Sequence, residues 1–446
     1  MKLYVVHAID TEGPLYESLD ATFERLEKII GMRLEPSRKT LEQIRNKELD
    51  LGGKEDAAAL VVSPQLLNYN DSWDKVDAML YEMLSPEYRQ RYADPTGRGW
   101  VYTWFIVDHV GYDMNPRRRD MGYHNIFDHY KSLLKETNSA DEINWHFHPM
   151  STYKEAHICA TSYLRSPHLL ETLARRIIDR GWFPSCFRPG FHAERPDAHW
   201  FLEQWLPFDF ANQATETDVA AQQDVMGGRL GDWRRAPNDW SPYHPAHDDY
   251  QTEGSCRRTI FRCLNVGTRF KLLDESEVER AFARAASGKP TILAFTNHDF
   301  RDMRHDVAET HALIQRVASR YPEVIWQNSG AKEAARAVLA RKEGEPFELE
   351  VRLEHNRLSV TANHDSFGPQ PFLAIKTHDK RYLTDNFDLQ SPRRHWTYTF
   401  DADTVPLSSI ESFGIASNDL NGSSHVLTFG AEGKIILNKQ YHDTTW

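Results

Sequence analysis

The chain has 446 residues, of which 40% are hydrophobic and 26% charged, and its 65 acidic residues outnumber its 53 Lys and Arg residues to give a formal charge of −12. This length exceeds one ordinary domain, so we expect a large domain and a smaller one. The negative charge argues against nucleic acid and anionic membrane as partners. The sequence contains no run of about 18 apolar residues, the length that would predict a membrane span.

The first residues of the chain and its cysteines indicate the cellular compartment in which we expect the protein. The segment MKLYVVHAIDTEGP lacks the long apolar core and the small-residue cleavage site of a signal peptide, so it is interpreted as a strand. The four cysteines are sparse and none forms a CxxC pair, which argues against a disulfide scaffold. These features predict a soluble cytoplasmic protein.

Short apolar runs that end on polar or ionisable residues predict buried strands that end at a site. The clearest are LYVVHAID (3–10), WVYTWFIVDH (100–109), EINWHFHP (142–149) and TILAFTNHD (291–299). Weaker candidates are FPSCFRPG (183–190), FDFAN (208–212) and EVIWQN (323–328).

Amphipathic helical patterns over 168–181, 277–288 and 304–321 alternate with these runs. Such alternation predicts an α/β fold with a parallel sheet. About seven parallel strands can close into a barrel, whose reactive side chains gather at the carboxyl ends of the strands.

Two stretches depart from the alternation. Residues 15–99 carry helical patterns directly after the first strand, so we expect a helical insertion that overhangs the site. Beyond about residue 345 the sequence changes to short alternating segments separated by Gly, Asn and Asp. We therefore predict a barrel domain over 1–340 and an all-β, sandwich-like domain over 346–446.

Two strand ends carry paired ionisable residues. Asp10 and Glu12 are two positions apart, as are His146 and His148, so each pair shares one face of its strand while Phe147 points the other way. A carboxylate and two imidazoles form a three-ligand site that leaves room for water, which is typical of catalytic zinc. We expect Zn, with Fe, Co or Ni as alternatives.

These residues and their order resemble the polysaccharide deacetylase superfamily, the carbohydrate esterase family 4 group. IDTEGP resembles the first motif, which implies a distorted (β/α)7 barrel with Asp10 as base and Glu12 as metal ligand. EINWHFHP resembles the second motif, which supplies two histidine ligands. The usual position of the second, four residues after His146, is Met150, so His148 takes its place, with His157 in reserve.

The later motifs imply further roles. FRPGFH resembles the motif whose arginine pairs with the catalytic acid, which implies that Arg188 holds Asp10 ionised. FTNHDF resembles the motif whose histidine protonates the leaving amine, and His298 takes that role. Asp299 either orients an imidazole or caps a neighbouring turn.

An aromatic and His-rich segment, APNDWSPYHPAHDDY, resembles a substrate-side loop found in outlying branches of the superfamily. Trp240, Tyr243 and His244 are candidates to stack on and hydrogen-bond a sugar, although ordinary packing is an alternative. His109 is a further pocket candidate because it follows a strand.

The sequence therefore predicts a metal-dependent hydrolase that removes an acetyl or formyl group from an amino sugar, either a small molecule or a lipid-linked one, in surface-polysaccharide biosynthesis. Alternatives are a metal-free hydrolase of cyclic amides or imides, and a catalytically silent glycan-binding protein. A two-carboxylate glycosidase is a weaker rival, because Asp10 and Glu12 share one strand face.

Overall fold

The computed structural model describes all residues except 151–153, 155–161, 217–230, 268–271, 342–343 and 443–446. Parallel strands close into a barrel in the order β1 to β7, because β1 pairs with β7 on one side and with β2 on the other. The barrel strands are β1 (Lys2–Thr11), β2 (Tyr102–Val107), β3 (Glu142–Phe147), β4 (Cys186–Pro189), β5 (Phe208–Asn212), β6 (Thr259–Asn265) and β7 (Thr291–His298).

The strand set differs from the sequence prediction at two places. The run at 323–328 does form a strand, β8 (Ile325–Asn328), but it pairs only with the first residues of β1 and stands outside the closed barrel. The seventh barrel strand is instead β6, which was not predicted.

Strand β1 is buried at every position except Lys2, because both of its faces are covered. Tyr4, Val6 and Ala8 pack inside the barrel, whereas Leu3 and Val5 face the surrounding helices. This alternation places the next inward position, residue 10, at the carboxyl end of the barrel interior.

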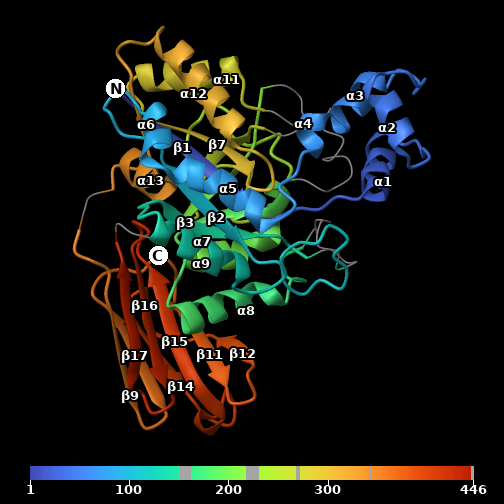
Figure 1. Cartoon of the computed structure of the whole chain (residues 1–446). Helices are drawn as coiled ribbons and strands as arrows, with labels where there is room; N and C mark the ends of the chain where they lie inside the picture. The colour runs from blue at the N-terminus through green and yellow to red at the C-terminus, as the bar shows by residue number, and fades with distance from the viewer. Residues whose placement is uncertain (151–153, 155–161, 217–230, 268–271, 342–343, 443–446) are drawn as a thin grey trace.

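Helices surround the barrel and cover its strands (Figure 1). They are α5 (Trp73–Leu84), α6 (Pro86–Arg91), α7 (Asn125–Glu136), α8 (His168–Arg175), α9 (His199–Trp205), α11 (Glu275–Ala286), α12 (Arg304–Ala318) and α13 (Ala331–Val338). A π-helical turn, Arg176–Arg180, continues α8, and short 3-10 turns occupy Gly190–His192, Pro196–Ala198 and Leu407–Ser409. No described helix is long and apolar enough to cross a membrane.

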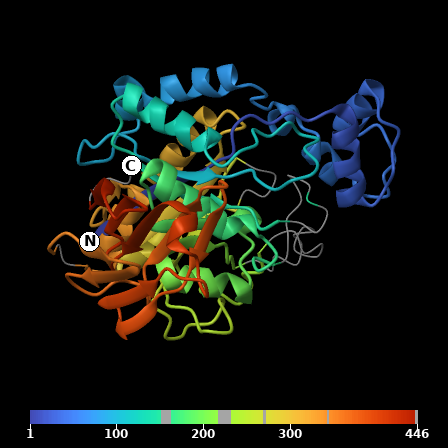
Figure 2. The same cartoon turned by 90° about the horizontal axis from the view of Figure 1, so that it is seen from below.

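The predicted insertion divides into two parts. Helices α1 (Leu19–Ile30), α2 (Arg38–Arg45), α3 (Glu55–Val61) and α4 (Pro64–Leu67) form a lobe that stands apart from the barrel in both views (Figures 1 and 2). The lobe has its own apolar cluster, which includes Phe23, Leu26 and Ile44. Helices α5 and α6 instead contribute Met79, Leu80 and other residues to the main cluster around the barrel.

The C-terminal residues form two antiparallel sheets that pack as a sandwich (Figure 1). One sheet has the order β13-β14-β10-β9 and the other β12-β11-β15-β16-β17. The strands are β9 (Leu349–Glu354), β10 (Arg357–Ala362), β11 (Phe372–Thr377), β12 (Tyr382–Asp385), β13 (Asp388–Ser391), β14 (His395–Thr399), β15 (Ile410–Asn418), β16 (Ser424–Gly430) and β17 (Ile435–Tyr441). The structure thus confirms the predicted fold class, an α/β barrel with a helical insertion and an all-β C-terminal domain.

Candidate active site

The ends of β1, β3, β4 and β7 bring the predicted catalytic and metal-binding residues together. In the strand register Asp10 of β1 stands opposite His298 of β7, and His146 of β3 stands opposite Arg188 of β4. Glu12 and His148 follow β1 and β3 directly. The predicted base, acid, arginine and three metal ligands therefore lie in one cluster at the carboxyl end of the barrel.

Asp10 is held as an ionised carboxylate. Arg188 donates from Nε to Oδ1 at 2.6 Å and from Nη2 to Oδ2 at 3.0 Å, and both side chains are buried. Burial raises the pKa of Asp10, but Arg188 and then His146 outweigh it and hold that pKa below its ordinary value. An ionised carboxylate at this position is able to accept a proton at neutral pH.

Glu12, His146 and His148 point their ligand atoms at one another. The Nε2 atoms of the two histidines are 2.9 Å apart. Glu12 Oε1 lies 3.4 Å from His148 Nε2 and 4.0 Å from His146 Nε2. All three residues are buried, and their ligand atoms fall within 4.8 Å of one another. Ligand atoms this close together could share one small cation.

The tautomer of His146 supports the same assignment. Its Nδ1 lies 2.9 Å from the backbone carbonyl of Arg188, which can only accept, so Nδ1 carries the proton and Nε2 presents its lone pair to the cluster. Burial lowers the pKa of His146 to about 4, although Asp10 opposes this, so the ring is neutral near pH 7. A buried carboxylate with two imidazoles is a donor set that suits Zn and related divalent ions, so the residues fit a divalent metal.

Two residues that the sequence did not assign to the metal site support Glu12. Arg119 Nη2 lies 2.6 Å from Glu12 Oε2, and His109 Nε2 lies 3.3 Å from the backbone oxygen of Glu12. Burial raises the pKa of Glu12, but Arg119 and then His148 lower it well below its ordinary value. Arg119 lies in a run of three arginines that has no strand or helix periodicity, so no sequence signal distinguished it.

Asp299 fixes the turn that carries Glu12. Its Oδ1 accepts from the backbone N–H of Glu12 at 2.8 Å, and its Oδ2 accepts from the N–H of Gly13 at 2.9 Å and from the Tyr130 hydroxyl at 2.7 Å. The carboxyl is fully buried, and burial raises its pKa to about 6. Of the two roles that the sequence left open, the contacts favour capping a turn over orienting an imidazole.

Two glycines permit the close approach of neighbouring groups. Gly13 has φ of +66°, and a Cβ there would lie 3.0 Å from the Trp73 ring. A Cβ on Gly190, which follows β4, would lie 2.4 Å from Cδ2 of His148. The absence of both side chains lets Glu12 and His148 reach their positions.

His298 lies on the accessible side of the cluster. Its Nε2 is 3.8 Å from Asp10 Oδ2 and 3.7 Å from Glu12 Oε1. The His298 side chain is 19% exposed, against 2% for Asp10 and 5% for Glu12. Burial lowers the pKa of His298, while Glu12 and Asp10 oppose that shift.

The predicted sugar-stacking residues make structural contacts instead. Trp240 is 2% exposed, its indole N–H donates to the backbone oxygen of Glu277, and the Arg262 guanidinium covers its ring at 4.4 Å. Tyr243 is 4% exposed and its hydroxyl donates to the backbone oxygen of Tyr250. Because these rings are covered, the structure corrects the expectation that they stack on a sugar.

The other predicted pocket residues are His109, which is buried, and His244, which is half-buried. His109 is fully buried against His148, with its ring centroid 5.8 Å from that of His148, so it supports the metal site rather than offering a surface to substrate. His244 is half-buried, and its Nδ1 donates to the backbone oxygen of Arg258 at 2.9 Å. His157, the reserve ligand, lies outside the described residues.

A second group of possible ligands, His199, Glu203 and Cys256, does not suit a metal in this arrangement. Arg258 donates from Nη1 to Nδ1 of His199 at 2.8 Å, so the proton of a neutral His199 ring lies on Nε2, the atom nearest Cys256 Sγ at 3.4 Å. A protonated Nε2 has no lone pair to bind an ion.

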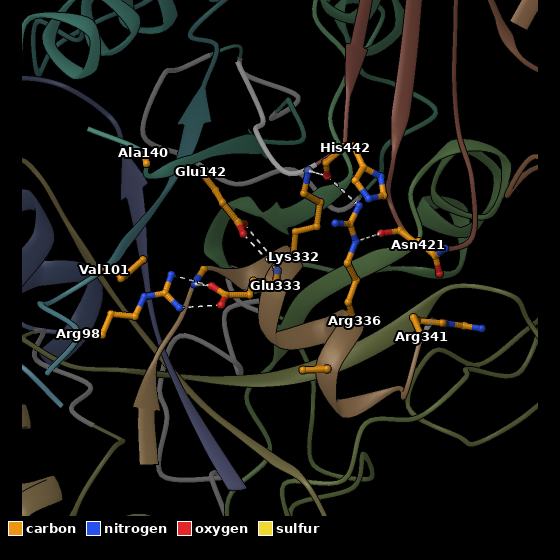
Figure 3. Close-up of a pocket in the computed structure, with 12 residues that line it drawn as sticks. Arg98, Val101, Ala140, Glu142, Lys332, Glu333, Arg336, Arg341, Asn421 and His442 are labelled. Atoms are coloured by element: carbon orange, nitrogen blue, oxygen red, sulfur yellow. Dashed lines mark hydrogen bonds and ion pairs between the residues drawn. The ribbon is translucent and has the colours of Figure 1, made fainter. Parts of the chain in front are cut away.

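A cavity of about 530 Å³ lies at the opposite end of the barrel, where α13 and the C-terminal domain meet (Figure 3). Several of its charged side chains have protein partners: Arg98 pairs with Glu333, Lys332 Nζ donates to the His442 carbonyl, and Arg336 donates to the carbonyls of Asn421 and His442. This cavity is a seam between the domains and contains none of the predicted catalytic residues.

Comparisons with known proteins add little. No family model and no curated protein matches the chain. One similar solved structure, from Parabacteroides distasonis, is described as a "putative glycoside hydrolase/deacetylase". It is 10% identical to this chain, with a TM-score of 0.37 over 92% of this chain and 88% of that chain. A likeness this distant carries no argument about function.

Proposed function

We propose that the protein is a metal-dependent amidohydrolase that removes an N-acyl group, acetyl or formyl, from an amino sugar. The observation that carries the proposal is the buried cluster at the carboxyl end of the barrel, in which Asp10, paired with Arg188, lies beside Glu12, His146 and His148. The resemblance of the motifs to the polysaccharide deacetylase superfamily supports the same reaction.

Each residue has a task in that reaction. Glu12, His146 and His148 would hold a divalent ion, which when bound supplies Lewis-acid polarisation of a carbonyl and lowers the pKa of water. Asp10 accepts the proton of the attacking water, and Arg188 keeps Asp10 ionised for that step.

His298 completes the proposal on the accessible side of the cluster. Its Nε2 lies within 4 Å of both acidic side chains, and its ring is the most exposed of the group. The amide nitrogen of a substrate that enters from solvent would therefore lie next to His298. His298 donates the proton that lets the sugar amine depart. We propose Zn as the metal, with Fe, Co or Ni as alternatives, and a small-molecule or lipid-linked amino sugar of surface-polysaccharide biosynthesis as substrate, in the cytoplasm.

The test measures metal content and acyl release together. Purified protein is assayed for bound Zn, Fe, Co and Ni, and for acetate or formate released from a panel of N-acetyl and N-formyl amino sugars. We expect one ion per chain, loss of turnover on chelation and recovery with Zn. We expect Asp10→Asn to retain the ion but lose about 10²- to 10⁴-fold in kcat, the usual contribution of a general base.

The exposed Asp248→Asn serves as the matched control and should behave as the native protein. Acyl release that survives complete removal of metal would instead support a metal-free hydrolase of the same carbon–nitrogen bond. Undiminished turnover in Asp10→Asn would overturn the base assignment. Tight sugar binding by the native protein without acyl release would favour a glycan-binding protein.

A further inference from the structure

Among the described residues, an arginine close to His298 forms no ion pair with a carboxylate within 4 Å. Phe300, two residues after His298, packs with its ring centroid 4.8 Å from the His298 ring. The Arg119 and Arg301 guanidinium groups each lie 4.9 Å from the centre of the Phe300 ring. Two positive charges therefore share one aromatic ring next to the proposed acid.

The other arginines of this region pair with glutamates. Arg119 pairs with Glu12, whereas Arg25 and Arg117 both pair with Glu17. Within the described part of the chain Arg301 forms no ion pair with a carboxylate, and its Nε donates to the backbone oxygen of Leu66 at 3.3 Å. Arg301 thus differs from these three arginines, each of which contacts a glutamate within 4 Å.

The backbone around Arg301 is fixed. Residue 301 forms an antiparallel bridge with Tyr69, and the N–H of Asn70 donates to the backbone oxygen of Phe300 at 2.9 Å. The Tyr69 ring lies 5.1 Å from the guanidinium, on which Leu66 and Phe300 also converge. The residue is partly buried, so part of its surface is accessible from solvent.

The arrangement holds like charges close together. Burial lowers the pKa of Arg301 from its ordinary value, Tyr69 opposes the shift, and Arg25 adds to it. Like charges held close together repel, and a fixed guanidinium is preorganised for two parallel hydrogen bonds to a phosphate or carboxylate. An anion between these groups would relieve the repulsion.

We propose that Arg301 binds an anionic oxygen group of the substrate, a phosphate or a carboxylate, on the side of the site where His298 receives the leaving amine. This inference rests on the proposed function and narrows its substrate class to amino sugars that carry a negative charge. Neutral acylamino sugars would bind weakly because they leave the Arg301 charge without a partner.

The first experiment measures binding without turnover. Calorimetric titration of the metal-loaded full chain with inorganic phosphate, at constant ionic strength, compares the native protein with Arg301→Met and Arg304→Met. Arg304 is a suitable control because it lies three residues away and already pairs with Asp302 and Glu82. We expect Arg301→Met to weaken phosphate binding about 10- to 100-fold, the usual loss of a charged hydrogen-bonding partner, and Arg304→Met to leave it unchanged.

The second experiment uses matched substrates: N-acetylglucosamine, its 1-phosphate, and N-acetylmuramic acid, which carries a carboxylate. Arg301→Met should raise KM for the charged compound that the site prefers by about 10- to 100-fold, with kcat little changed and the neutral sugar unaffected. The phosphate and carboxylate compounds identify which anion is bound. Arg301→Lys, which keeps the charge and the aliphatic stem, should recover part of the loss and shows that the site still folds.

Equal phosphate affinity in native and Arg301→Met protein would overturn the assignment of Arg301, whatever the reaction. The same holds if the variant lowers kcat/KM equally for neutral and charged sugars, because that result indicates a structural role. Absence of turnover with every acylamino sugar, combined with the expected change in phosphate binding, would instead count against the proposed function alone.

Discussion

Asp299 shows how one buried side chain sets the position of Glu12, a proposed metal ligand. It receives two backbone N–H groups and a tyrosine hydroxyl, so it holds the turn from which Glu12 projects. In Asp299→Asn the amide nitrogen would face donors that it cannot accept from, so the turn would lose one or two of these bonds. Outer groups of this kind typically change metal affinity about 10- to 100-fold, and we expect a loss in that range.

Chelator competition measures that affinity directly. The exposed Asp302→Asn is the matched control, since it lies in the same segment but contacts only Arg304 at the surface. Unchanged metal affinity in Asp299→Asn would contradict this role for the turn.

His7 carries a pH dependence that is separate from the metal site. It is 1% exposed, accepts from the Trp100 indole at Nδ1, and bonds to Asn297 through Nε2. Burial lowers its pKa to about 4, partly opposed by Asn297. Between about pH 6.5 and pH 4 the unfolded chain therefore binds a proton that the folded protein excludes.

The sign follows from that difference: the free energy of unfolding falls as the pH drops through this window. His7 contributes on the order of 3 kcal/mol to the fall. Urea unfolding at a series of pH values should show a shallower decline in His7→Gln than in the native protein. An identical decline in both proteins would show that His7 does not titrate on unfolding.

At the residue scale, spacing predicted the cluster because strand geometry is simple. Period-2 alternation puts Asp10 on the interior face of β1 and Phe147 in the outer packing, where the structure has them. The support of Glu12 by Arg119 depends on a loop, and the burial of Trp240 depends on a helix distant in sequence. Neither contact could be predicted, because no pattern in the neighbouring sequence indicates it.

At the scale of elements, the sequence prediction misses a strand where a charged residue interrupts the apolar pattern. Strand β6 contains Arg262, which is buried only because Glu277 of α11 pairs with it through two bonds of 2.7 Å. The run at 323–328 does form a strand, but pairing at one end of β1, rather than composition, keeps it out of the barrel. Tertiary pairing decided both cases.

The insertion gives a prediction at the same scale. Because α1 to α3 pack on their own cluster, Leu26→Ala should destabilise the lobe by about 2 to 5 kcal/mol and accelerate amide hydrogen exchange there, while β1 and β7 keep their protection. Leu80→Ala in α5 is the matched control, since Leu80 belongs to the cluster around the barrel. Leu80→Ala should accelerate amide hydrogen exchange in the barrel strands as well. Exchange that increases equally in lobe and barrel for Leu26→Ala would contradict an independent lobe.

At the scale of the whole molecule, the barrel and the sandwich share a core. Phe372, Ala416 and Tyr441 of the C-terminal sheets belong to the same apolar cluster as the barrel helices. The Asn418 amide donates to the backbone oxygens of Pro184 at 2.7 Å and Trp205 at 2.8 Å. These contacts imply that the two parts unfold together.

Asn418→Ala tests this coupling, because it leaves two buried carbonyl groups without a donor. We expect a loss of about 1 to 3 kcal/mol and a single calorimetric transition that shifts as a whole. The exposed Asn386→Ala should leave the transition in place. Two separate transitions in the native protein would show that the domains are thermodynamically independent.

Strand β1 pairs with β7, β2 and β8, and in this register Asp10 stands opposite His298. Strand β1 lies far ahead of its partners β7 and β8 in the chain, so during synthesis it lacks two of its neighbours until they emerge. Barrel closure is therefore a late, long-range step, and such steps are slow. Because that closure also places Asp10 opposite His298, a chain that stops before β7 cannot assemble the proposed pair of base and acid.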